Sequence, residues 1–276
     1  MMIQFQCVAA DCFLSDYYPM KFSLLRMKKA FSSWQYGLKN KAWNSLYIEN
    51  HDHPRIISRY GSEFFWKESG KMLAAMYLFQ QGTPFIYQGQ EIGMINWRPE
   101  NVEEYRDVQT IWNYNHTALN KTEEQRLKRQ WRSARDSART PVQWSAEKNA
   151  GFSDAETTWI SVNPNYTWLN AAQQEEDPDS ILNFYRKAVA LRKKLSCVRY
   201  GEYKEYYPTS DKFYMYSMED DAQKILVVCS FHEKDVKVPT PKSFDMASAK
   251  LILCNYAESK KNTLQPYECK VYLWKK

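Results

Sequence analysis

Residues 45–55 read Ser-Leu-Tyr-Ile-Glu-Asn-His-Asp-His-Pro-Arg, and this stretch decides which fold the sequence predicts. Two apolar residues alternate along it before Asn50-His51-Asp52, a proline and an arginine. We interpret it as a strand that delivers three hydrogen-bonding side chains to its carboxyl end, where α/β barrels place their chemistry. The alternative is a strand that runs into an ordinary turn, since Asn, Asp and Pro also favour turns for local reasons.

A second stretch, residues 82–94, repeats this arrangement. It reads Gly-Thr-Pro-Phe-Ile-Tyr-Gln-Gly-Gln-Glu-Ile-Gly-Met, which is a turn, a short apolar strand and then polar side chains among glycines. Between the two stretches, residues 68–81 carry apolar side chains at the spacings of one helix face. A strand, a helix and a second strand with short connections predict the βαβ unit of a parallel sheet.

Four motifs together carry a resemblance to a known family. They are Asn50-His51-Asp52-His53-Pro54-Arg55, residues 82–91, Ala138-Arg139-Thr140-Pro141-Val142-Gln143-Trp144 and Asn163-Pro164-Asn165-Tyr166. In this order, and over essentially the whole chain, they resemble signatures of the α-amylase superfamily of glycoside hydrolases, most of all its oligo-1,6-glucosidase and α-glucosidase branch. The resemblance implies an α/β fold, a (β/α)8 TIM barrel followed by an antiparallel β-sandwich domain.

The same resemblance implies that this chain corresponds to the carboxyl-terminal half of such an enzyme. Residues 1–6 look like the sixth barrel strand, residues 44–49 like the seventh and residues 83–88 like the eighth. The nucleophilic aspartate and the acid/base glutamate of the superfamily follow the fourth and fifth strands, so both would precede Met1. A whole barrel typically needs about 250 residues. We expect a three-stranded piece to leave one strand edge unpaired, and the isolated chain to aggregate or to dissolve only with difficulty.

The resemblance also implies roles for individual residues. Retaining glycosidases use one carboxylate as nucleophile and another as acid/base, through a transition state that resembles an oxocarbenium ion. Asp52 would be the third carboxylate, which stabilises this state by holding ring hydroxyls, and His51 would donate to the same sugar. Asn50 and Arg55 are further substrate-binding candidates. Arg55 would hold a carboxylate or hydroxyl bidentately, or alternatively form a plain salt bridge with a neighbouring acid.

Three further positions leave alternatives open. Glu91, like Gln90, either lines the rim of the substrate site or satisfies backbone donors. Arg139 either braces the barrel and the surroundings of the pocket or pairs locally with Asp136. His53 stands where relatives commonly carry glutamine, and we interpret it as structural.

The switch to period-two patterning after residue 198 divides the chain into two parts. The resemblance implies that residues 1–198 are the carboxyl-terminal portion of the catalytic barrel, and residues 199–276 are predicted to be an all-β domain. Helices are predicted over residues 20–39, 68–81, 102–119, 122–136 and 180–195, and a loop over residues 7–19. Strands of period two are predicted over residues 213–218, 224–230, 250–254 and 268–274. In the last strand Cys269, Val271 and Leu273 alternate with Tyr272 and Trp274, so one face is aliphatic and the other aromatic.

Composition excludes several classes of partner. The net charge of +6, from 38 Lys and Arg against 32 Asp and Glu, is mild, and the basic segment at residues 126–135 is typical of a solvated helix face. Nucleic acid is therefore not expected, and no apolar run approaches the length that spans a membrane. The six cysteines lack CxxC or metal-ligand spacing, which favours a reducing, cytoplasmic location. No metal site and no cofactor is predicted.

Three functional hypotheses follow. The first is a retaining α-glucosidase that acts on short α-glucans in carbohydrate catabolism, inactive as this chain alone because both principal carboxylates are missing. Its partners would be the oligosaccharide and the amino-terminal half of the barrel. The second is a non-catalytic relative or truncated remnant. Phe5-Gln6-Cys7, where relatives often read Phe-Glu-His, indicates altered or degraded activity, whereas the retained Asn50-His51-Asp52 argues against a non-catalytic relative. The third is a relative that acts on trehalose 6-phosphate.

Overall fold

The parallel strands near the amino terminus are short. In the computed structural model, which describes residues 1–13 and 15–276, β3 (Ser45–Leu46) pairs in parallel with β4 (Thr83–Pro84), and Met2 forms a parallel bridge with Asn44. The three predicted strands therefore lie side by side in the expected order, but the regular ladder is much shorter than predicted. The residues after each strand form hydrogen bonds within turns instead: the Asp52 N–H donates to Asn50 Oδ1, and the Tyr87 N–H donates to Gln90 Oε1.

Helices cover these strands, and the two longest begin at capping serines. Ser23 and Ser180 accept backbone N–H groups of the first turn of α1 (Leu24–Leu38) and α7 (Ile181–Lys194), as N-cap serines do. The helices predicted over residues 20–39 and 180–195 are thus confirmed with trimmed ends, and the helix predicted over residues 68–81 is confirmed but begins at Trp66 and ends at Leu78. The remaining helices of this part are α2 (Ile56–Tyr60), α3 (Trp66–Leu78) and α8 (Ser196–Tyr200).

Residues 7–19 differ from the predicted loop. A 3-10 turn, η1 (Gln6–Ala9), precedes a small antiparallel pair, β1 (Cys12–Phe13) and β2 (Ser15–Pro19), whereas position 14 of this prediction lies outside the described residues. The short paired strands satisfy backbone groups locally, and the segment has no regular apolar spacing that would reveal them.

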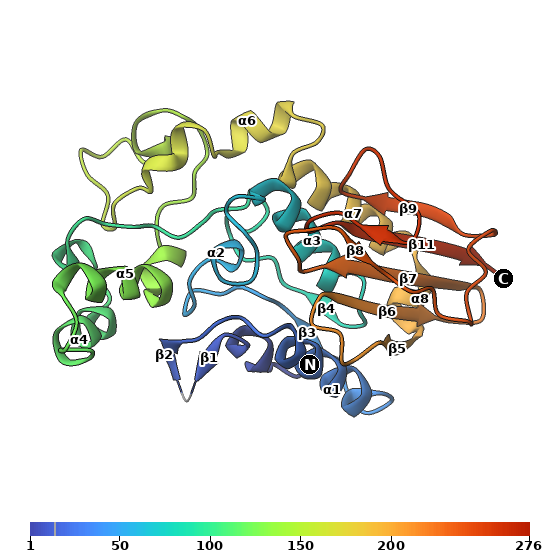
Figure 1. Ribbon diagram of the computed structural model, residues 1–276. Coiled ribbons are helices and arrows are strands. Elements are labelled where there is room, and N and C mark those ends of the chain that lie inside the picture. The colour runs from blue at the N-terminus through green and yellow to red at the C-terminus, as the bar shows by residue number, and fades with distance from the viewer. Residues whose placement is uncertain (14) are drawn as a thin grey trace.

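A long excursion separates β4 from α7, and it lies at one side of the molecule (Figure 1). The helix predicted over residues 102–119 is wrong as one element, because Tyr105 has an extended backbone and Asp107 caps a new helix. The helix predicted over residues 122–136 ends early, at Ser133. The elements are η2 (Val102–Glu104), α4 (Val108–His116), α5 (Glu123–Ser133), η3 (Arg135–Ala138), η4 (Lys148–Gly151), η5 (Pro164–Thr167) and α6 (Ala171–Glu176).

The carboxyl-terminal part is an antiparallel sheet with the order β5-β6-β7-β11-β9. Its strands are β5 (Glu202–Tyr206), β6 (Phe213–Glu219), β7 (Gln223–Ser230), β9 (Lys250–Cys254) and β11 (Cys269–Lys275). A second, two-stranded sheet joins β8 (Val236–Lys237) to β10 (Thr263–Leu264). The four predicted strands are confirmed, and β5 was not predicted.

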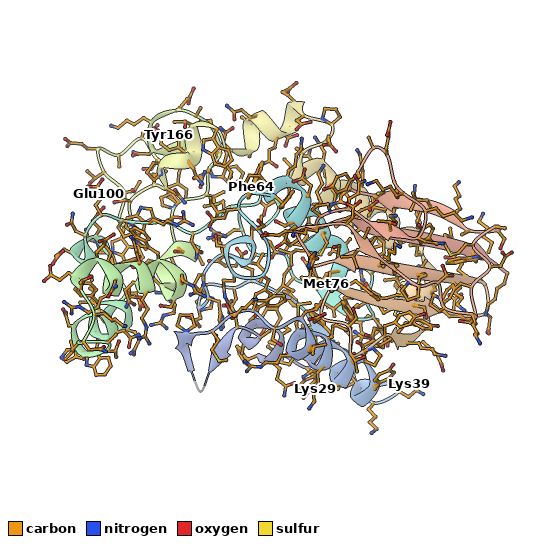
Figure 2. The ribbon with its side chains drawn as sticks, in the orientation of Figure 1. Lys29, Lys39, Phe64, Met76, Glu100 and Tyr166 are labelled. Carbon is orange, nitrogen blue, oxygen red and sulfur yellow. The ribbon has the colours of Figure 1, made fainter. Side chains whose placement is uncertain are left out.

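The two faces of the sheet bury different side chains. Cys269 and Val271 belong to the main core, which also contains Met76 of α3, buried between helix and sheet (Figure 2). Tyr272 and Trp274 pack on the other face, in a second cluster with Leu264 of β10. The predicted aliphatic and aromatic faces are confirmed, and the aliphatic face attaches the sheet to the helices.

Candidate functional site

The turn after β3 is built by Asn50. Its Oδ1 accepts the Asp52 N–H at 2.9 Å and lies 2.9 Å from Nδ1 of His53. His53 is buried, in agreement with its structural interpretation. The amide oxygen of Asn50 is thus used inside the protein, and it directs His51 and Asp52 outward.

The carboxylate of Asp52 lies between two arginines and His51. Its Oδ1 lies 3.0 Å from Nη2 of Arg139 and 3.5 Å from Nη1 of Arg135, and its Oδ2 lies 3.3 Å from Nε2 of His51. The side chains of Asp52 and His51 remain 45% and 69% exposed. The two arginines therefore hold the carboxylate while part of it stays open to a ligand.

Two aspartates hold the arginines in turn. Arg135 contacts Asp107 at 2.6 Å, and Arg139 lies 3.6 Å from Asp136 and 3.8 Å from Asp107. Burial raises the pKa of Asp107, but hydrogen bonds from Arg135 and Thr110 outweigh it, so the pKa lies below its usual range. Both alternatives for Arg139 hold, since it braces the Asp52 site and also pairs with Asp136.

Sequence reasoning missed Arg135 and Asp107. Arg135 precedes Arg139 by four residues in Arg-Asp-Ser-Ala-Arg, and that spacing within one motif was the available signal. Asp107 is also the N-cap of α4, where its Oδ2 accepts the Thr110 N–H. A single carboxylate that both caps a helix and binds an arginine is visible only in three dimensions.

Arg55 is fully buried and forms a salt bridge with Glu49, with 2.6 Å between Nη1 and Oε1. The alternative of a plain salt bridge is therefore confirmed. Neither side chain has any exposed surface. Burial raises the pKa of Glu49 above its usual range, and the contacts with Arg55 and the Ile56 N–H offset this only in part. Glu49 stands within the decisive stretch, yet the sequence analysis did not select it.

The side chain of Gln90 is buried and forms hydrogen bonds inside the protein, whereas Glu91 is only partly buried. Gln90 Nε2 donates to the hydroxyl groups of Tyr185 at 2.8 Å and Tyr77 at 3.3 Å, so it is not a rim residue. Burial raises the pKa of Glu91. Its Oε2 atom is buried and has no hydrogen-bond partner among the described residues.

An apolar groove of about 340 Å³ lies along the three parallel segments and reaches His51. Ile3 and Phe5 line it from the first segment and Phe85 and Ile86 from the third, and all four side chains are exposed. Exposed apolar surface of this kind marks a binding or contact surface.

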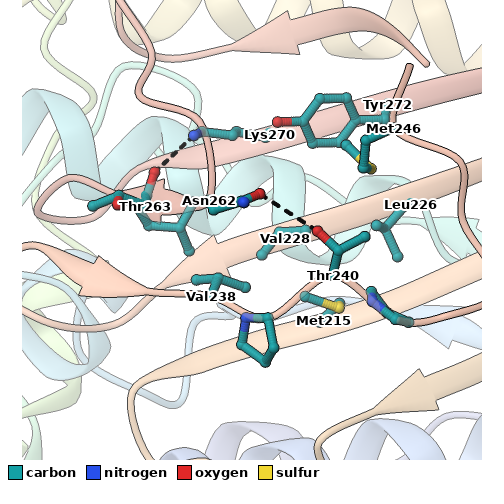
Figure 3. Close-up of a pocket in the computed structure, with 13 residues that line it drawn as sticks. Met215, Leu226, Val228, Val238, Thr240, Met246, Asn262, Thr263, Lys270 and Tyr272 are labelled. Atoms are coloured by element: carbon teal, nitrogen blue, oxygen red, sulfur yellow. Dashed lines mark hydrogen bonds between the residues drawn. The ribbon is translucent and has the colours of Figure 1, made fainter. Parts of the chain in front are cut away.

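A second cavity, of about 40 Å³, lies in the β-sheet domain (Figure 3). Met215, Leu226 and Val228 contribute apolar walls, and Lys270 at its edge donates to the carbonyl of Thr263 at 2.8 Å. Its polar groups are occupied by the protein, so we regard it as a gap in packing.

In residues 1–13 and 15–276, no group of three or more His, Cys, Asp or Glu side chains is arranged to hold a metal ion. Over the same ranges, no helix is long and apolar enough to cross a membrane.

Helix-covered parallel strands with Asp52 and His51 at a strand end define an α/β protein with a polar site of the kind that barrel enzymes build. The chain belongs to the α-amylase family: the description "Alpha amylase, catalytic domain" matches residues 1–201. The family resemblance drawn from the four motifs is thereby confirmed.

Individual relatives are similar over most of this chain. The probable oligo-1,6-glucosidase 2 of Bacillus subtilis (strain 168) is 39% identical over 264 residues, which are 94% of this chain and 46% of the relative. The α-glucosidase of Pediococcus pentosaceus is 40% identical over 260 residues, 91% of this chain and 46% of the relative. The crystal structure of Bacillus licheniformis trehalose-6-phosphate hydrolase superposes with a TM-score of 0.94 at 35% identity, covering 99% of this chain and 51% of that chain. The chain thus spans about half the length of these relatives.

Proposed function

We propose that this chain is part of a retaining α-glucosidase that acts on short α-glucans, similar to oligo-1,6-glucosidases. The observation that carries the proposal is the carboxylate of Asp52, half-exposed beside His51 and held by Arg139 at 3.0 Å. Relatives named oligo-1,6-glucosidase and α-glucosidase support the substrate class. A cytoplasmic location belongs to the same proposal, supported by buried thiols at Cys7, Cys197, Cys229 and Cys269.

In the proposed reaction, Asp52 accepts hydrogen bonds from ring hydroxyls, and these bonds strengthen as positive charge develops on the sugar. His51, at 3.3 Å from Asp52, donates to the same sugar. Asn50 shapes the turn that carries both residues, and Arg55 acts from the interior. Glu91 is the proposed rim residue. The nucleophile and the acid/base group would come from the other half of the barrel, so this chain alone would be inactive.

The proposed partner of these residues is therefore the amino-terminal half of the barrel. The supporting observation is the apolar groove, where Ile3 and Phe5 are 61% and 63% exposed beside Phe85 and Ile86. We also propose a division into a barrel portion, residues 1–198, and an all-β domain, residues 199–276. β5 begins at Glu202, after α8.

The test combines this chain with the separately produced amino-terminal half of the Bacillus subtilis relative and measures hydrolysis of isomaltose. Activity that appears only in the mixture, and that Asp52→Asn abolishes, supports the proposal. The control is Asp221→Asn, which changes an exposed aspartate between β6 and β7. A complex that forms without activity would contradict the glucosidase proposal and favour a non-catalytic relative.

A second candidate is hydrolysis of trehalose 6-phosphate. The structural match to the Bacillus licheniformis enzyme favours it, and Arg135 and Arg139 place positive charge beside Asp52. The same mixture assayed with trehalose 6-phosphate decides between the two: faster cleavage of that substrate than of isomaltose would replace the first proposal.

A further inference from the structure

We propose that the buried Glu49–Arg55 pair is a positioning device that sets Arg139 on the carboxylate of Asp52. The inference rests on the proposed function in one respect, namely that Asp52 is the residue whose position matters. Neither Glu49 nor Arg55 contacts solvent, so neither touches a substrate directly. Their effect passes through the turn that carries Arg139.

Arg55 connects three separate segments of the chain. Its Nη1 donates to Glu49 at 2.6 Å and to the carbonyl of Gln88 at 2.8 Å, which joins the segments that follow β3 and β4. Its Nε donates to the carbonyl of Ser137 at 3.2 Å, and its Nη2 to that of Ala138 at 3.3 Å. Residues 137–138 lie in the excursion, more than eighty positions further along the chain.

These two carbonyls belong to the turn between Arg135 and Arg139. Arg139 returns to the strand end, because its Nε donates to the carbonyl of His51 at 3.0 Å and its Nη2 to Asp52 at 3.0 Å. The contacts form a closed ring that runs from Glu49 through Arg55 and the turn to Arg139, and back to the residues that follow Glu49. A substitution at Glu49 or Arg55 therefore changes the position of the Arg139 side chain.

Only a guanidinium group serves all these acceptors at once. It presents five donors in one plane, whereas the ammonium group of lysine is a compact point charge. Glu49 fixes the plane, since its second oxygen accepts the Ile56 N–H at 2.9 Å and cannot swing away without losing that bond. Tyr87 adds a second support: its ring lies 5.4 Å from the guanidinium carbon, and its hydroxyl donates to the same Ala138 carbonyl at 3.0 Å.

The test measures hydrogen exchange at Nε–H of Arg139 by NMR in the sugar-free mixture of this chain with the amino-terminal half, with the signal assigned by its loss in Arg139→Lys. Glu49→Gln removes the charge at nearly constant shape, and Arg55→Lys keeps the charge but removes the donors to Ser137 and Ala138. In both variants exchange should accelerate about fivefold to tenfold, the change expected when one net hydrogen bond is lost.

The matched control is Arg192→Lys, another buried arginine that donates to backbone carbonyls, among them that of Gln80 at 2.7 Å. It should lower the urea midpoint but leave exchange at Arg139 within about twofold, less than the loss of one net hydrogen bond. Unchanged exchange in both Glu49→Gln and Arg55→Lys would overturn the inference, as would equal acceleration in the control. If Glu49→Gln fails to fold, Arg55→Lys decides alone.

No sugar is present in this measurement, so its outcome is independent of the proposed activity. If exchange accelerates as expected but the mixture does not hydrolyse isomaltose, the proposed function is overturned and the positioning role of Glu49 and Arg55 stands. If the mixtures are active but Arg139 exchanges equally fast in all variants, the proposed function stands and the positioning role of Glu49 and Arg55 is overturned.

Discussion

Replacing Arg192 by methionine should destabilise the whole chain. Arg192 lies in α7 and is 7% exposed. Its guanidinium donates to the carbonyls of Leu78 and Gly82 and, at 2.7 Å, to that of Gln80. Leu78 is the last residue of α3, so its carbonyl has no partner within the helix. One side chain thus closes the end of α3 and holds the entry to β4.

The magnitude follows from two opposing effects. A hydrogen bond from a charged donor contributes about 1.5–3 kcal/mol, and Arg192 makes three such bonds. Against this, burial lowers the pKa of Arg192 to about 10, which Tyr216 and Tyr77 offset only in part. That shift corresponds to about 3 kcal/mol against the charged form. Three bonds minus the cost of burying the charge leave a predicted loss of about 1.5–6 kcal/mol, a large share of a typical stability of about 5–15 kcal/mol.

Urea unfolding followed by tryptophan fluorescence measures this loss. The matched control is Arg186→Met in the same helix, where the arginine is exposed and pairs with Glu175 at the surface. The control should leave the urea midpoint nearly unchanged, because surface ion pairs contribute little. A loss below about 1 kcal/mol for Arg192→Met, less than one charge-assisted hydrogen bond, would refute the reasoning.

Three further predictions concern the site and the groove. Because the folded-state pKa of Asp107 lies below its usual range, the stability that this carboxylate contributes is complete above about pH 4 and is lost as pH falls through the folded pKa. The melting temperature of Asp107→Asn should therefore fall less steeply than that of the unmodified chain between pH 6 and pH 3, and equally steep falls would contradict this. Gly89→Ala should cost about 1–3 kcal/mol in urea unfolding, since φ is +83° and the added methyl group meets Met94; an unchanged midpoint is the contrary result. The isolated chain should self-associate through its groove, and Phe5→Ser with Phe85→Ser should reduce the association in sedimentation velocity; a monomeric unmodified chain would show the expectation to be wrong.

The sequence predicted features that depend on neighbours along the chain. Apolar spacing predicted α1, α3 and α7, and the alternation of Val271 with Tyr272 predicted the two faces of β11. Asn50-His51-Asp52 at a strand end predicted the place of the candidate site. These features are local, because a helix face or a strand face is set by residues two to four positions apart.

Tertiary structure decided the partners of those residues. Patterning did not show that Arg55 is buried on Glu49, that Gln90 bonds Tyr185, or that Arg139 reaches Asp52. Nor did it show the break before α4, because Asp107 caps that helix while it also binds Arg135. The sequence around an arginine and a neighbouring acid is the same whether the pair lies at the surface or in the core, and only the packing of distant segments decides whether the pair is buried. The sequence by itself therefore determined where polar chemistry gathers, and the fold decided which groups face the ligand and which hold them in place.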